Sequence, residues 1–125
     1  MKVVALIARI LLGLMFVMSG VIGFLPINKG PMPTGLAGQF VVALMQSHFI
    51  YVVSGLQLIG GALLLANRYV PLALTLLGPV IVNIFLYHLF MDQKDLPIAI
   101  VVVALWFVVY GRYRKNFEGI FAQKA

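Results

Sequence analysis

The chain has 125 residues, of which 63% are hydrophobic and 10% charged, and its mean hydropathy is +1.10. This composition is typical of membrane proteins and lies far from the averages of soluble domains. The absence of cysteine excludes disulfides, thiolate metal sites and thiol–disulfide exchange. A chain this short and this apolar has no room for a soluble catalytic module, so we expect a single membrane domain over residues 1–125.

Four apolar stretches make up most of the chain, and almost no charge interrupts them. They cover residues 3–25, 49–66, 69–91 and 96–110. A bilayer core about 30 Å thick requires about 20 helical residues, each of which advances about 1.5 Å. Long runs of Leu, Ile, Val and Phe without alternation favour helices over the strands of a barrel. The sequence therefore predicts an all-α membrane protein with four transmembrane helices in an antiparallel bundle.

The connections between these stretches predict how neighbouring helices are joined. Only Asn67 and Arg68 separate the second stretch from the third, so these two helices should form a tight antiparallel hairpin. A longer connection, rich in Pro and Gly, follows the first stretch. After it, Leu36 and Phe40 begin an apolar pattern that repeats every four residues. This spacing predicts a short interfacial or re-entrant helix over residues 36–47.

The distribution of Lys and Arg predicts the orientation. With four spans both termini lie on one side of the membrane, and seven of the nine Lys and Arg residues fall on that side. They are Lys2, Arg9, Arg68, Arg112, Arg114, Lys115 and Lys124. Lys29 and Lys94 fall on the other side, so the positive-inside rule makes both termini cytoplasmic. Topology and lipid headgroups account for the net charge of +6, and no nucleic acid partner is expected.

Two further features fit the predicted cytoplasmic interface. Arg9 lies near the start of the first stretch, and its long side chain is expected to reach out to the lipid phosphates. Trp106, Tyr110 and Tyr113 recur at helical spacing near the end of the fourth stretch. Aromatic residues in this position are typical of a belt at the membrane surface.

Small residues predict where the helices approach one another closely. Gly13 and Gly20 lie in the first stretch, and Gly60 and Gly61 lie in the second. Small residues at helical spacing let two backbones come close together in a membrane, where van der Waals packing drives helix association. We therefore expect these four glycines to serve helix packing.

Polar side chains inside the spans are costly in hydrocarbon and tend to face a partner or a cavity. Pro79 should kink the third helix and turn Asn83 toward the bundle. The hairpin should then bring polar residues of the second and third helices together near the outer surface, around a pocket where Asp92 orients His88. The predicted ligand-binding residues are His48, Tyr51, Gln57, Asn83, Tyr87, His88 and Asp92.

Several kinds of chemistry are open to this cluster. His48 and His88 could ligate a haem from facing helices, or a transition metal together with Asp92, but paired histidines often occur by accident at membrane edges. We therefore expect neither haem nor a metal site. A quinone fits better, because His, Tyr and Asn can hydrogen-bond its oxygens while Phe and Leu supply apolar walls. Interfacial Tyr and His are also ordinary headgroup anchors.

Four segments carry a family resemblance. They are residues 9–20 (RILLGLMFVMSG), 55–61 (GLQLIGG), 68–73 (RYVPLA) and 78–92 (GPVIVNIFLYHLFMD). Together they resemble the DoxX family of bacterial and archaeal membrane proteins, over nearly the whole chain. Gln57 stands where many relatives carry Glu, which argues against a proton-coupled mechanism. The resemblance implies a four-helix integral protein of the bacterial cytoplasmic (inner) membrane, in a family where some members are associated with quinone-linked oxidoreductases or oxidative stress.

These observations leave three classes of function open. We expect a small membrane subunit or binding module for a quinone-like or other lipophilic molecule, associated with a quinone-linked or stress-related oxidoreductase system. The alternatives are a non-catalytic anchor or assembly partner of another protein, and a small transporter, for which only Pro79 suggests a broken helix. No catalytic residues are recognisable. The sequence leaves the partner protein and the oligomeric state open, a homo-oligomer included.

Overall fold

The computed structural model describes residues 2–25, 34–91 and 93–120. This part of the chain folds into five α-helices and two short 3-10 helices, without a strand. They are α1 (Lys2–Phe24), α2 (Gly35–Gln46), α3 (Phe49–Ala66), α4 (Val70–Phe90), η1 (Gln93–Asp95), α5 (Leu96–Tyr113) and η2 (Arg114–Phe117). The predicted all-α fold class is confirmed. The last long helix runs beyond its predicted end at residue 110, because Gly111 continues the helix instead of ending it.

Four of these helices are long and apolar enough to cross a membrane: α1, α3, α4, and α5 with its flanking 3-10 turns. Their outward faces expose large apolar side chains, among them Ile7, Leu14, Val52, Leu72 and Ile98. Water would solvate these side chains poorly, whereas lipid tails solvate them well. The chain is therefore a multi-pass membrane protein. α2, with 12 residues, is too short to cross.

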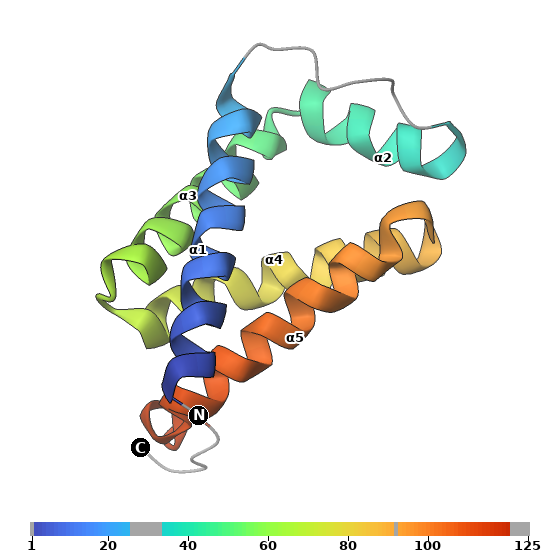
Figure 1. Ribbon diagram of the computed structural model, residues 1–125. Helices are drawn as coiled ribbons and strands as arrows, with labels where there is room; N and C mark the ends of the chain where they lie inside the picture. Colours follow the sequence, from blue (N-terminus) through green and yellow to red (C-terminus); the bar gives the residue numbers. More distant parts are fainter. Residues whose placement is uncertain (1, 26–33, 92, 121–125) are drawn as a thin grey trace.

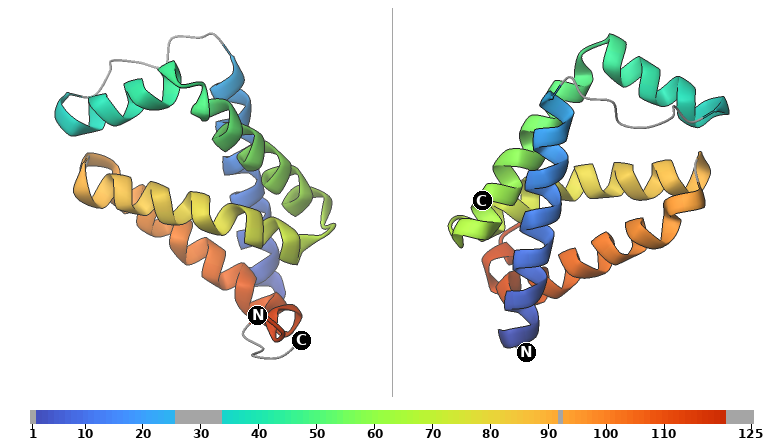
Figure 2. Two further views of the ribbon diagram at one scale, coloured as in Figure 1. Left: turned by 180° about the vertical axis from the view of Figure 1, so that it is seen from behind. Right: turned by 45° about the horizontal axis from the view of Figure 1, so that its top comes forward.

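The long helices form two pairs that meet at one end of the bundle and diverge toward the other (Figures 1 and 2). α1 packs along α3, and α4 packs along α5. All the buried residues of α4 lie between Val70 and Ile81, so the second half of this helix leaves the core. We call the end that contains Lys2, Asn67 and Arg112 the basic end, and the opposite end the α2 end.

The short helix α2 lies across the α2 end, over the end of α4 and the start of α5 (Figure 2). Its Phe40 ring contacts the Tyr87 ring of α4, with 5.3 Å between the ring centroids. Leu36 at its start is 67% exposed. The short helix predicted between the first two spans is therefore present. Its position across the bundle end suits a helix that lies along the membrane surface.

Glycines allow α1 and α3 to pack with their backbones close together. A Cβ atom added to Gly61 would lie 2.8 Å from the Gly13 carbonyl oxygen and 2.8 Å from the Val17 amide nitrogen. One added to Gly20 would lie 2.7 Å from the backbone nitrogen of Leu58. Gly60, in contrast, faces α4, where Leu77 fills the space beside it. The structure thus places three of the four glycines at the α1–α3 contact and the fourth at the α3–α4 contact.

The turn between α3 and α4 holds these two helices together at the basic end. Asn67 adopts a left-handed conformation (φ 56°), and its backbone N–H and that of Arg68 bond to carbonyls in the last turn of α3. Asn is among the residues that tolerate this conformation best. Pro71 lies in the first turn of α4, where its missing N–H costs little. The tight hairpin predicted from the sequence is therefore confirmed.

Candidate functional site

Gln57, one of the predicted ligand-binding residues, lies at the α1–α3 contact. Its side chain is 7% exposed, and its Oε1 accepts a hydrogen bond from the Ser19 hydroxyl at 2.8 Å. Ser54, one turn earlier on α3, is 2% exposed and lies against Gly23 of α1. These polar groups join α1 to α3. The hydrogen bond between Ser19 and Gln57 therefore links these two helices.

His48 and Tyr51 lie at the start of α3, at the α2 end. The two rings stack with 5.9 Å between their centroids, and Tyr51 also stacks on Phe24 of α1 at 5.7 Å. Tyr51 is 45% exposed. The rings therefore form a short exposed row on α1 and α3, a position that also suits the headgroup anchoring considered from the sequence.

Tyr87 and His88 lie near the end of α4. The two rings meet edge to face at 5.1 Å, and Tyr87 also contacts Phe40 of α2. The Nδ1 atom of His88 lies 2.8 Å from the Ile84 carbonyl oxygen. A carbonyl oxygen only accepts, so Nδ1 carries the proton and donates, and Nε2 of a neutral His88 is left as an acceptor.

The sequence predicts that a kink at Pro79 turns Asn83 toward the bundle. The Asn83 side chain is exposed, so it is not packed against another helix inside the bundle. α4 continues unbroken from Val70 to Phe90 with Pro79 inside it, and its second half has already diverged from α3 at this depth. Asp92, expected to orient His88, lies outside the described residues; the described partner of His88 is Ile84.

The predicted cluster is therefore divided among different neighbours. Gln57 bonds to α1, and Tyr51 joins His48 to Phe24 of α1. Tyr87 contacts α2, whereas His88 bonds within its own helix. This division follows from the divergence of the two helix pairs. Within residues 2–25, 34–91 and 93–120, no three His, Asp or Glu side chains come together as a metal site would require.

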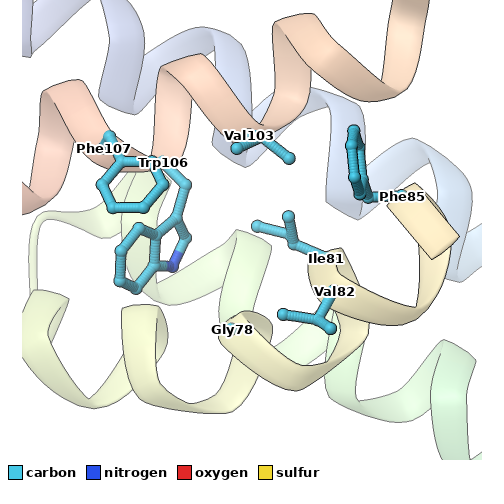
Figure 3. A pocket seen from close by; sticks show the side chains of 7 residues that line it. All are labelled: Gly78, Ile81, Val82, Phe85, Val103, Trp106 and Phe107. Atoms are coloured by element: carbon cyan, nitrogen blue, oxygen red, sulfur yellow. The ribbon is translucent and has the colours of Figure 1, made fainter. Parts of the chain in front are cut away.

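An apolar pocket lies between α4 and α5 (Figure 3). Its volume is about 320 Å³. Its walls are aliphatic and aromatic, and they are formed by Gly78, Ile81, Val82, Phe85, Val103, Trp106 and Phe107. These residues lie in the middle parts of α4 and α5, so the pocket lies within the membrane-spanning part of the bundle.

Trp106 forms a fixed wall of this pocket. Its indole nitrogen donates to the Leu74 carbonyl oxygen at 3.0 Å, and its ring stacks on Tyr110 with 5.4 Å between centroids. The N–H of Trp106, which was expected in a belt at the membrane surface, therefore bonds to α4 inside the bundle. Gly78 lies opposite, where an added Cβ would be 3.9 Å from Trp106 Cζ2, an ordinary contact. The missing side chain at Gly78 contributes to the free space.

Sequence reasoning missed this pocket. The pairing of Gly78 with Trp106 is invisible along the chain, because the two residues lie on different helices. The available signal was Gly78 one residue before Pro79 in an otherwise bulky apolar run. Comparisons with protein-family models, with curated proteins and with solved structures find no match for this chain.

Proposed function

We propose that this protein is a membrane binding module for a lipophilic aromatic molecule of the quinone or quinol class, held between α4 and α5. The observation that carries the proposal is the apolar pocket of about 320 Å³ at mid-membrane depth, with Phe85, Trp106 and Phe107 in its walls. Ligand pockets commonly have volumes of about 300–1,000 Å³ and largely apolar, aromatic linings. A volume near the lower limit suits a single ring with short substituents.

The Trp106 wall favours a flat ring over a flexible acyl chain. Its indole is held by a hydrogen bond to Leu74 and by stacking on Tyr110, so little side-chain entropy is lost when a ligand packs on it. A planar ring stacked on a fixed indole gains contact over its whole face.

His88 supplies a polar group beyond the pocket. It follows Ile81 by seven residues, which places it on the same face of α4, about 4.5 Å beyond Phe85 along the helix axis. Because Nδ1 donates to Ile84, Nε2 of a neutral His88 accepts, which suits a phenolic hydroxyl of a quinol. A charged His88 would donate from Nε2 and suit a quinone oxygen.

The proposal also covers the membrane in which the protein lies, its orientation and the enzyme system with which it is associated. We place it in the bacterial cytoplasmic membrane with both termini in the cytoplasm, because seven of its nine Lys and Arg residues fall on the side of the termini. The resemblance to the DoxX family supports an association with a quinone-linked or stress-related oxidoreductase system. A lipophilic ligand that diffuses in the bilayer would suit such an association.

Fluorescence of Trp106 can test the binding directly, because it is the only Trp in the chain and it lines the pocket. The purified protein in lipid nanodiscs is titrated with a short-chain benzoquinone. We expect saturable quenching. Gly78→Leu fills the pocket and should weaken binding by about tenfold or more, since burial of the ring is lost. Val101→Leu, on an exposed face of α5 outside the pocket, is the matched control and should bind as the wild type does.

Two further variants locate the polar end of the ligand. His88→Phe should weaken binding by up to about tenfold, the value of one neutral hydrogen bond. Asn83→Leu should leave binding unchanged if the ligand lies between α4 and α5, and should weaken it if the ligand lies between α3 and α4. Linear, unsaturable quenching that is the same in wild type and Gly78→Leu would refute the proposal and favour a membrane anchor or assembly partner.

A further inference from the structure

A second cavity, of about 230 Å³, lies at the basic end, where α1 begins, α5 ends and α3 turns into α4. Its polar walls are formed by Lys2, Arg9, Asn67, Arg112 and Tyr113. Three of these residues are cations, and none of the described residues that line the cavity is acidic. The cavity therefore gathers positive charge that its own walls do not neutralise.

Arg9 is the buried cation of this cavity. It is 9% exposed, and its Nη1 donates to the Leu64 carbonyl oxygen in the last turn of α3. Arg9 was expected to reach out to the lipid phosphates; one arm of its guanidinium instead bonds to the end of α3, where a helix offers unpaired carbonyls, while its side chain still lines the cavity. That helix end carries roughly half a negative charge, which offsets only part of the Arg9 charge. A buried charge is costly unless it is fully compensated.

The neighbouring groups also present donors. Asn67 Oδ1 accepts a hydrogen bond from the Tyr113 hydroxyl at 3.2 Å, so the free part of the Asn67 side chain is its NH₂ group. The Arg112 guanidinium lies 6.0 Å from the centre of the Tyr113 ring. Lys2, Arg9 and Arg112 carry only donors. A ligand that matches these walls is an anion with several acceptor oxygens.

We infer that this cavity binds a phosphate group, and that its source is the headgroup of an anionic phospholipid. Ala5 and Leu6 of α1 supply apolar wall beside the cations, which suits the glycerol part of a lipid. Lys2 and Arg9 are about 10 Å apart along the α1 axis, so the cavity extends from the helix end into the bundle. Basic pockets between transmembrane helices bind anionic headgroups by the same combination of charge and depth.

Native mass spectrometry of the full chain in a neutral detergent tests the site. Phosphatidylglycerol and phosphatidylcholine of the same acyl chains are added in separate titrations, and phosphatidylglycerol should bind about tenfold more tightly or better. Arg112→Gln should lose about tenfold in phosphatidylglycerol affinity, the value of one charge-assisted contact. Arg114→Gln removes the same charge two residues away, on a side chain that does not line the cavity, and should change the affinity less than twofold.

Excess inorganic phosphate identifies the source of the anion. Binding of phosphatidylglycerol that resists competition by phosphate supports the lipid headgroup. Binding of phosphate alone, lost in Arg112→Gln and without lipid preference, keeps the phosphate site but replaces the lipid by a free anion. Equal losses in Arg112→Gln and Arg114→Gln, or equal affinity for both lipids, would overturn the inference, because the attraction would then come from the general positive charge of this end.

Discussion

Replacing Gly61 by Ala probes a close backbone contact between α1 and α3. The added Cβ would lie 2.8 Å from the Gly13 carbonyl oxygen and the Val17 amide nitrogen, whereas an ordinary contact begins at 3.4 Å. α1 would have to retreat by about 0.6 Å, and both obstacles are backbone atoms that cannot rotate away. Overpacking of this kind costs about 1–3 kcal/mol.

Gly55→Ala is the matched control on the same helix. There the added Cβ meets only Phe24 Cζ, at 3.8 Å, so nothing has to move. Both substitutions gain the same helix propensity, up to about 1 kcal/mol, so this term cancels in their difference. Gly61→Ala should therefore be less stable than Gly55→Ala by about 1–3 kcal/mol, measured by unfolding in mixed micelles with circular dichroism. Equal stability of the two variants would refute the close α1–α3 contact.

Two further predictions test the α1–α3 contact and the topology. Ser19→Ala removes the donor to Gln57 and should cost about 0.6 kcal/mol, up to about 1.7, as membrane hydrogen bonds do. The same change in a Gln57→Leu background should cost nothing; equal costs in both backgrounds would show that the bond contributes no stability. Because the chain has no Cys, Lys94→Cys should react with an impermeant thiol reagent in intact cells, whereas Arg68→Cys should react only after permeabilisation. The reverse pattern would invert the proposed orientation.

The sequence by itself determined the number and type of the long helices and, apart from the end of α5, their approximate bounds. In lipid a segment must satisfy its backbone hydrogen bonds internally, so the length of each apolar run decides whether it spans. Local signals mark the breaks: Asn67 accepts the left-handed conformation of the turn, and Pro71 suits the first turn of a helix. These are short-range effects, and they can be read without knowing the neighbours of a helix.

The tertiary structure decided which neighbouring helix each helix face contacts. Periodicity shows which residues share a face of a helix, but the tilt of the helix follows from packing, here from Gly13 against Gly61 and from Leu77 beside Gly60. This packing holds α3 against α1 over its length, while the pair of α4 and α5 diverges from the pair of α1 and α3.

The divergence of the two helix pairs also determines which partners the polar residues have. Gln57 bonds to Ser19 of α1, whereas Asn83 on the diverging half of α4 remains exposed. Arg9 donates a hydrogen bond to a carbonyl at the end of α3, and Trp106 donates one to a carbonyl of α4. In each case the donor bonds to an acceptor that packing brings within reach, and that acceptor lies 32 to 55 residues away along the chain.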